Sequence, residues 1–339
     1  MIVLGIESTC DETGASIVVD GKKILSNVVA SSADIHEQYG GVFPELACRR
    51  HIDAIIPVVD EAIRLAQLNP SDIDLIAVAK GPGLVGALLI GMNVAKGLSI
   101  AWEKPLIGVN HVEAHLYAAL LEAPEPYPFP ALGIVLSGGH TLMLKIEDVG
   151  RYEMIGTTVD DAIGEAFDKV AALLSLPYPG GPQIERLALQ GNSTAFPFSS
   201  GKVKRSPLDF SFSGLKTNVL YAVKGQNGTG QVCLSEGQKA DVAASFQETA
   251  LGDIAAKAAM AIQTFPCKAI FLGGGVCNNQ RLRSLFAEKF PHLPIFWPPF
   301  NLSLDNAAMI AGLGYQKFLA AGSISDPLDL EVQTRIVFA

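Results

Sequence analysis

Residues 2–20 read IVLGIESTCDETGASIVVD, and this stretch predicts a β-hairpin with a polar tip. Residues 2–7 and 15–20 are apolar runs typical of buried strands, and the polar residues 8–14 join them as a turn. Small and acidic side chains at such a tip are available for chemistry, because a hairpin presents its turn to the surroundings.

A second unit of the same kind lies in the other half of the chain. Residues 131–136 and 142–146 are apolar, and the loop Ser137-Gly138-Gly139-His140-Thr141 joins them. Because strand, small polar loop and strand occur once in each half, we interpret the chain as an internal duplication.

The rest of the chain alternates between strands and helices. Strands are predicted at residues 75–79, 106–109 and 269–272, and helices at 53–67, 84–102, 160–174, 238–265, 279–290 and 305–321. This alternation indicates α/β layers, and the duplicated hairpin favours two related α/β lobes over one doubly wound sheet. Residues 122–130 carry four prolines and are the best candidate for a domain boundary.

Composition excludes several classes of protein. The chain has 339 residues, of which 49% are hydrophobic and 17% are charged, so it can fill a core and is no disordered chain. Its five cysteines form no C-x-x-C pair, which argues against a disulfide framework and favours a reducing cytosol. No signal peptide is recognised at the N-terminus. The apolar residues 81–95 are too few to cross a membrane, so we expect a loop that enters a buried helix.

Residues 111–115, HVEAH, place two histidines one helical turn apart, which suits two ligands of one metal ion. Asn110 is placed to cap that helix. A third ligand has to come from elsewhere, and Asp305 is one candidate, with a simple N-cap as the alternative. The motif is not that of zincin proteases, since Glu113 does not directly follow His111.

Two glycine-rich loops predict a nucleotide site. In residues 137–139, glycines let backbone N–H groups approach an anion closely, although a tight turn is the alternative. Residues 273–275 are three glycines between a predicted strand and a predicted helix, with Asn279 at the start of that helix. Such a junction suits a nucleotide, because helix N-termini favour phosphate and glycines admit a sugar or ring.

Other polar residues specify less chemistry. Asp161, Glu165 and Asp168 fall on one face of a predicted helix, where a solvated surface is the default interpretation. Residues 209–216, DFSFSGLK, indicate a loop near a ligand without specifying a reaction.

Together these segments resemble the bacterial tRNA adenosine threonylcarbamoyltransferase family, TsaD. The motifs that carry the resemblance lie, in order, at residues 5–14, 40–45, 81–86, 111–115, 137–141, 165–169, 178–182, 209–217, 273–276 and 305–308. They span nearly the whole chain. Two places depart from the usual pattern: Cys277-Asn278-Asn279 stands where Ser-Ala-Asn is frequent, and Leu302-Ser303-Leu304 where Cys-Thr is common.

The resemblance implies the fold shared by actin, sugar kinases and Hsp70 (ASKHA), with two duplicated ribonuclease-H-like lobes around a central cleft. We expect an N-terminal lobe of residues 1–125 plus about 305–339, and a C-terminal lobe of residues 126–304. The implied reaction moves a threonylcarbamoyl group from threonylcarbamoyl-adenylate to the exocyclic amine of the adenosine beside the anticodon. The tRNAs concerned read codons that begin with A, and AMP is released.

The resemblance also implies the site residues. The metal would be Fe²⁺, one per subunit, held by His111, His115 and Asp305; two histidines and a carboxylate also suit zinc. The adenylate would be bound by residues matching Val135, Leu136, Ser137, Gly138, Gly139, Asp168, Gly181, Glu185 and Asn279. From their place on the hairpin tip, we expect Asp11 or Glu12 to accept the amine proton.

Implied partners are tRNA, a TsaB-like paralogue that forms a heterodimer with the chain, and a TsaE-like ATPase, with no membrane. The formal net charge of −9 argues against a nucleic-acid partner, whereas the motifs favour tRNA. Basic clusters at residues 49–51 and 202–205 are small. We therefore expect weak tRNA affinity for the chain alone, with partner proteins completing the basic surface.

Three other functions remain as alternatives. A metabolite kinase of the same fold would phosphorylate a small acid or sugar with ATP. A nucleotide-switched scaffold would need neither the histidine pair nor tRNA. A metalloprotease is the weakest, since the helix lacks a glutamate placed to activate water.

Overall fold

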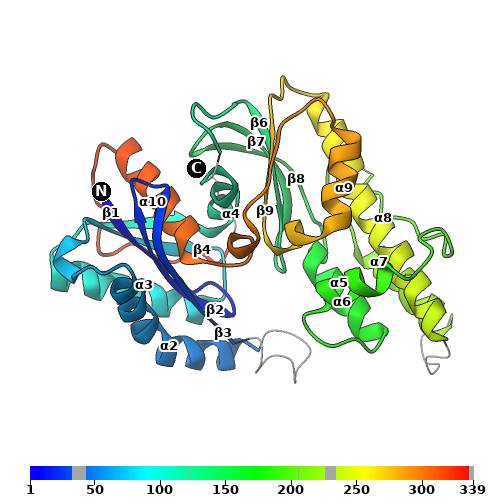
Figure 1. The fold of residues 1–339 in the computed structure, drawn as a ribbon, viewed down its shortest axis with the longest axis horizontal. Helices are drawn as coiled ribbons and strands as arrows, with labels where there is room; N and C mark the ends of the chain where they lie inside the picture. The colour runs from blue at the N-terminus through cyan, green and yellow to red at the C-terminus, as the bar shows by residue number, and fades with distance from the viewer. Residues whose placement is uncertain (33–42, 122, 205, 226–233, 336–339) are drawn as a thin grey trace. The chain divides into compact units, whose positions relative to one another are not determined.

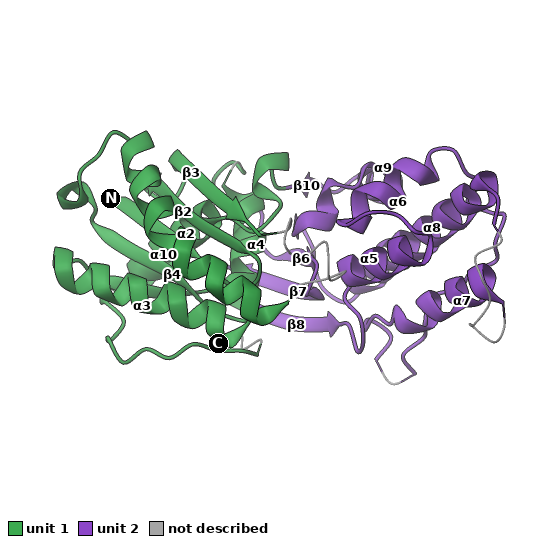
Figure 2. Ribbon diagram, turned by 90° about the horizontal axis from the view of Figure 1, so that it is seen from below, with its two compact units in different colours: residues 1–127, 149–151, 298–339 green, residues 128–148, 152–297 purple. Residues whose placement is uncertain are grey.

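The computed structural model describes residues 1–32, 43–121, 123–204, 206–225 and 234–335. Residues 40–42 of the family motif and Arg205 of the basic cluster lie outside this part. The chain forms two compact units: unit 1 comprises residues 1–127, 149–151 and 298–339, and unit 2 comprises residues 128–148 and 152–297 (Figure 1; Figure 2).

Unit 1 is a five-stranded sheet with helices. Its strands are β1 (Ile2–Glu7), β2 (Glu12–Val19), β3 (Lys23–Ser31), β4 (Leu75–Gly81) and β5 (Leu106–Asn110). Its helices are α2 (Pro44–Leu65), α3 (Val85–Trp102), α4 (His111–Leu120) and α10 (Ala307–Ala320), with short 3-10 turns η2 (Pro70–Asp72) and η4 (Phe300–Leu302).

Unit 2 repeats this plan. Its strands are β6 (Ala131–Leu136), β7 (Thr141–Asp148), β8 (Arg151–Thr157), β9 (Ile270–Gly273) and β10 (Ile295–Phe296). Its helices are α5 (Ile163–Leu173), α6 (Gly180–Ala188), α7 (Ser213–Lys224), α8 (Glu236–Ile262) and α9 (Gln280–Lys289), with the 3-10 turn η3 (Gly275–Asn278).

The strand orders show the duplication. Unit 1 has the order β3-β2-β1-β4-β5, and unit 2, in the same sense, has β8-β7-β6-β9-β10. In each unit the first strand pairs antiparallel with its hairpin partner and parallel with the strand on its other side. The predicted α/β class with two duplicated lobes is therefore confirmed.

Close packing of α10 on β1 organises unit 1. A β-carbon on Gly5 would overlap the carbonyl oxygen of Ala307 and would lie 2.8 Å from the backbone nitrogen of Ala311. Small residues at these positions let the helix backbone lie directly on the strand. The start of α10, and with it Asp305, is thereby brought to the sheet.

Several predicted boundaries were wrong. β2 begins at Glu12 rather than at residue 15, because Glu12 and Thr13 pair with Ser31 and Ala30 of β3, a strand that was not predicted. α2 begins at Pro44 rather than at residue 53, since proline is compatible with the first turn of a helix. The start of α7 covers residues 213–216, which were expected to be loop.

The expectation of a buried helix after residue 84 also needs correction. α3 is long and apolar enough to cross a membrane by length and composition alone. Only 33% of its apolar window is buried in the structure, so it is not the buried helix that was expected. It packs against α2 and β4, and Val85, Leu89 and Ile100 remain exposed. α3 therefore covers the sheet on one side and presents an apolar face on the other.

Substitution of Gly5 tests the packing of α10 on β1. Gly5→Ala should lower the free energy of unfolding by about 1–3 kcal/mol, because the helix must move away from the strand. Gly97→Ala is the matched control: Gly97 is exposed on α3, a β-carbon there would meet nothing within 4 Å, and alanine should stabilise the helix by up to about 1 kcal/mol. Urea unfolding measures both variants, and an unchanged midpoint for Gly5→Ala would contradict the packing argument.

Candidate metal centre and nucleotide loops

Two histidines and one aspartate of unit 1 converge. The ring centroids of His111 and His115 lie 4.6 Å apart on successive turns of α4. Asp305 Oδ1 lies 3.1 Å from His115 Nε2 and 3.6 Å from His111 Nε2. Because one ligand atom from each residue lies within 4.8 Å of the others, the three side chains can share one metal ion.

Two asparagines hold these ligands in place. Asn110 ends β5 and caps α4, accepting hydrogen bonds from the backbone nitrogens of Val112 and Glu113, as predicted. Asn306 caps α10 in the same way, through Met309 N. Asp305 is therefore not the helix cap, the alternative left open by the sequence, and its carboxylate is directed to the histidines.

The donor set fits a metal ion. His115 is fully buried, and neither of its ring nitrogens has a hydrogen-bond partner of acceptable geometry among the described residues, although Nε2 faces Asp305. A buried polar atom without a partner is costly unless something binds it. Two imidazoles and one carboxylate leave coordination positions for a substrate.

Glu7 is a further candidate residue of this site, and it was not predicted from the sequence. It ends β1 with no exposed surface, and its Oε2 lies 2.9 Å from His111 Nδ1 while its Oε1 accepts a hydrogen bond from Thr9 N. A carboxylate accepts hydrogen bonds, so the proton resides on Nδ1 and His111 Nε2 faces Asp305. The signal in the sequence was a glutamate at the end of an otherwise apolar strand.

Asp11 and Glu12 lie at the same hairpin tip, and their carboxylate oxygens group with those of Asp305 within 4.8 Å. Burial, together with the charges of Asp305 and Asp11, raises the pKa of Glu12 to about 10. The Glu12 carboxyl is therefore protonated at neutral pH unless a cation is bound nearby. It can accept a proton from substrate only after such a cation has lowered its pKa.

The loop at residues 137–139 of unit 2 is a tight turn with an open face. Ser137 N donates to His140 O, and His140 N donates to Ser137 Oγ. A β-carbon on Gly138 or Gly139 would meet nothing within 4 Å, so a ligand has access to the backbone there. The side chains of Val135 and Leu136 are fully buried, and their backbone pairs with β7, at Val135 also with β9, so these two residues position the loop from within the sheet.

Two predicted adenylate residues hold the neighbouring elements together. Asp168 Oδ1 accepts from Gly180 N at 2.7 Å, beside Gly181, where a β-carbon would also meet open space. Glu185 Oε1 accepts from Gln280 N at 2.6 Å, at the start of α9. The carboxylate of Glu185 thus occupies the helix end that we expected to favour phosphate.

Asn279 has a structural partner as well. Its Oδ1 caps α9 through Leu282 N, and its Nδ2 donates to Gln247 Oε1 at 2.8 Å. Both amides are at least nine-tenths buried. Gln247 lies on α8, far from Asn279 in sequence, and nothing in the local pattern indicated it.

The predicted carboxylate face on α5 is different in the structure. Asp161 precedes the helix, and its two oxygens accept from Lys169 Nζ at 2.8 Å and Lys216 Nζ at 2.6 Å. Partial burial opposes ionisation, but the two lysines outweigh it and lower the pKa of Asp161. Lys169 also pairs with Glu165 at 2.7 Å. Asp161 therefore joins α5 to α7 as a neutralised ion pair.

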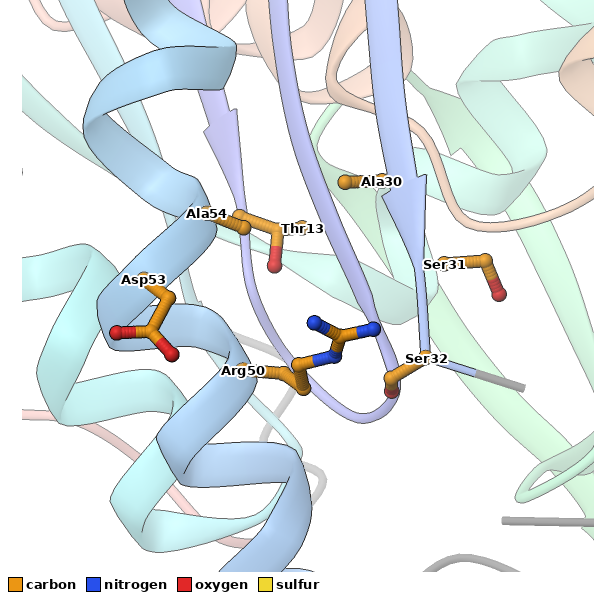
Figure 3. Close-up of a pocket in the computed structure, with 7 residues that line it drawn as sticks. All are labelled: Thr13, Ala30, Ser31, Ser32, Arg50, Asp53 and Ala54. Carbon is orange, nitrogen blue, oxygen red and sulfur yellow. The ribbon is translucent and has the colours of Figure 1, made fainter. Parts of the chain in front are cut away.

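A cavity of about 220 Å³ lies between β2, β3 and α2 of unit 1 (Figure 3). It is lined by Thr13, Ala30, Ser31, Ser32, Arg50, Asp53 and Ala54. Its lining includes none of the three metal-ligand candidates. The hydroxyl of Thr13 lies 2.8 Å from His51 Nδ1, so this polar group of the cavity wall already has a hydrogen-bond partner within the protein.

The ionisation of His111 predicts how metal binding depends on pH. Burial lowers the pKa of His111, but the charges of Glu7 and Asp305 outweigh it and raise the pKa to about 9. A metal ion has to displace the Nε2 proton, so apparent affinity for Co²⁺ should rise between about pH 7 and about pH 9. Titration followed by the visible bands of Co²⁺ measures this, and a flat affinity would contradict it.

Glu7→Gln provides the matched variant. Removing the carboxylate takes away part of what raises the pKa of His111, so the rise in Co²⁺ affinity should move to lower pH. Loss of the orienting partner should also weaken affinity at high pH by about 10–100-fold. An unchanged titration would show that Glu7 does not act on His111.

Comparison with known proteins identifies the family. The family model of TsaD, tRNA N6-adenosine threonylcarbamoyltransferase, matches residues 23–312. A protein of that name from Protochlamydia amoebophila is 59% identical over 336 residues, covering 99% of this chain and 98% of the relative. A protein of the same name from Chlamydia pneumoniae is 50% identical over 329 residues, covering 96% and 94%.

Solved structures agree on the fold. HypF from T. kodakarensis superposes with a TM-score of 0.64 at 15% identity, covering 96% of this chain and 48% of that chain. The ROK hexokinase from Thermus thermophilus gives 0.52 at 15% identity, covering 95% and 99%. At this identity the likeness concerns the fold alone, and it supports the ASKHA class. The family match over most of its length shows that this chain belongs to the tRNA N6-adenosine threonylcarbamoyltransferase family.

Proposed function

We propose that the chain transfers a threonylcarbamoyl group from threonylcarbamoyl-adenylate to the exocyclic amine of the adenosine beside the anticodon. The acceptors are tRNAs that read codons beginning with A, and AMP is the second product. Membership of the family supports this reaction. The observation that carries it is the group formed by the buried His111 and His115 with the half-buried Asp305, because a kinase or a nucleotide-switched scaffold needs no such ligands.

The metal is proposed to be Fe²⁺, one per chain, with Zn²⁺ as the alternative. His111, His115 and Asp305 would hold it, and Glu7 would orient His111. When bound, such an ion supplies Lewis acidity toward an oxygen of the acyl group.

The remaining steps belong to the chain's own residues. Backbone N–H groups of Gly138 and Gly139 hold the phosphate of the adenylate, whereas the N–H of Ser137 closes the turn on His140 O. The Asn279 end of α9 receives the nucleoside. The amine nitrogen forms a bond to the carbamoyl carbon. The bond from that carbon to the phosphate oxygen breaks, and AMP leaves with the electron pair. Asp11 or ionised Glu12 takes the amine proton.

Single substitutions of the ligands test the proposal. His111→Ala and Asp305→Ala should each lower the rate of single-turnover transfer more than about a hundredfold. Loss of a metal ligand should reduce the rate more than loss of a residue that only orients a ligand, which typically costs about 10–100-fold. Bound metal should fall in parallel. His292→Ala, at an exposed histidine of unit 2, is the control that should keep both. If Asp305→Ala retained its metal and its rate, the proposed role of this group would be wrong.

A TsaB-like paralogue and a TsaE-like ATPase are the proposed protein partners. The support is an apolar face on α2 and α3, formed by Ile52, Ile56, Val85 and Leu89, each at least 44% exposed. The two helices approach closely where Gly86 lies against Cys48 Sγ. Exposed apolar residues at helical spacing on two packed helices are typical of protein interfaces. We propose that the paralogue covers this face.

Charge substitutions on this face test the partner. Ile56→Glu combined with Leu89→Glu should abolish co-elution with the paralogue, because carboxylates would be buried in the interface. Leu319→Glu, at an exposed leucine of α10, is the control and should leave co-elution unchanged. Retained association in the double variant would place the paralogue elsewhere.

The proposed compartment is the cytoplasm. Cys10, Cys48, Cys267 and Cys277 are free thiols, which suits a reducing environment.

A further inference from the structure

The turn that leads to Asp305 exposes two large apolar side chains. Phe300 is 57% exposed and Leu304 is 60% exposed. Leu304 is the residue directly before Asp305, whose carboxylate reaches the two histidines of α4. Single exposed apolar residues need no explanation, but here two occur on one short turn that also carries a candidate metal ligand.

Hydrogen bonds and burial hold this turn in one conformation. Leu302 and Ser303 are buried, and Ser303 Oγ donates to the carbonyl of Pro299 at 3.0 Å. The side-chain nitrogen of Asn306 donates to the carbonyls of Leu302 and Leu304, at 2.9 and 2.8 Å. Phe300 and Leu304 therefore project from a fixed backbone, and a ligand that packs on them need not order the turn first.

The charges around Asp305 restrict what such a ligand can be. Asp11, Glu12 and Asp305 group their carboxylates at the hairpin tip, so phosphates would be repelled by any of these groups that is ionised. The uncharged face of a nucleobase has no such penalty. Unpaired bases commonly stack on aromatic or apolar side chains and offer their edges for reaction or readout.

We propose that Phe300 and Leu304 form an apolar platform on which an unpaired base of the tRNA packs, with its exocyclic amine beside Asp305. This inference rests on the proposed function, because it takes the acceptor to be the amine of an adenine. When the face of the adenine ring lies on Phe300 and Leu304, the amine at the edge of the ring can point toward the Asp305 carboxylate. The platform binds the acceptor and takes no part in bond making.

The test is steady-state transfer with tRNA as the varied substrate, under conditions in which the wild-type chain is active. Phe300→Ala combined with Leu304→Ala should raise the KM for tRNA about tenfold or more, as expected when a stacking side chain is lost. The kcat, the KM for threonylcarbamoyl-adenylate and the Co²⁺ affinity should stay within twofold of wild type. The single variant Phe300→Tyr keeps the ring and should keep the wild-type KM for tRNA. Ile324→Ala, at a 69% exposed residue of unit 1, is the control and should also leave this KM unchanged.

Binding of an isolated anticodon stem-loop RNA provides a second measurement without catalysis. Its affinity should fall in the double variant by a factor similar to the change in KM. An unchanged KM and an unchanged stem-loop affinity would overturn the inference. The inference would also be overturned if the double variant changed only the KM for threonylcarbamoyl-adenylate, or if its main effect were a loss of co-elution with a protein partner. If the wild-type chain transferred nothing to tRNA, the proposed function itself would be wrong.

Discussion

The close contact between Gly5 of β1 and the backbone of α10 is the constraint on which the candidate metal centre depends. The histidines lie on α4, directly after β5, whereas Asp305 comes from nearly two hundred residues further along the chain. Only a short distance between strand and helix brings the start of α10 to the end of the sheet. Glu7, two residues beyond Gly5 on the same strand, then reaches His111 from the other side. The absence of a side chain at one position therefore has consequences for three ligands.

Much of this arrangement could be predicted from the sequence, because it depends on local sequence patterns. The repeated hairpin, the HVEAH spacing and the asparagine before α4 each depend on residues close together in the chain. What was missed depends on tertiary contacts. β3 was not predicted because its polar residues adopt a strand conformation only through pairing with β2. Gln247 is recognisable as a partner only once α8 and α9 are packed, and the glutamate at the end of the first strand does not by itself reveal His111 as its partner. The helix boundary that placed Asp161 on α5 failed because two lysines stabilise it in the preceding turn instead.

The candidate site residues thus divide by what they do in the folded chain. Asn110, Asn306 and Asn279 all cap helices, so the same side chains that border the sites also begin the elements that carry them. Asp168 and Glu185 likewise use their carboxylates on backbone N–H groups. Such residues serve the local fold as well as the candidate sites. Loss of activity on their substitution has to be separated from loss of the local fold.

The carboxylate of Glu185 at the start of α9 has a consequence for the polarity of a bound nucleotide. A free helix N-terminus attracts anions, but here Gln280 N is already occupied by a negative group. A phosphate would meet repulsion at this end of unit 2, while the glycine turn after β6 offers uncharged backbone with open space above it. A nucleotide bridging the two loops would therefore run in one direction, phosphate toward β6 and base toward α9. In the proposed reaction, electrostatics would then direct the reactive end of the adenylate before any contact with its acyl group.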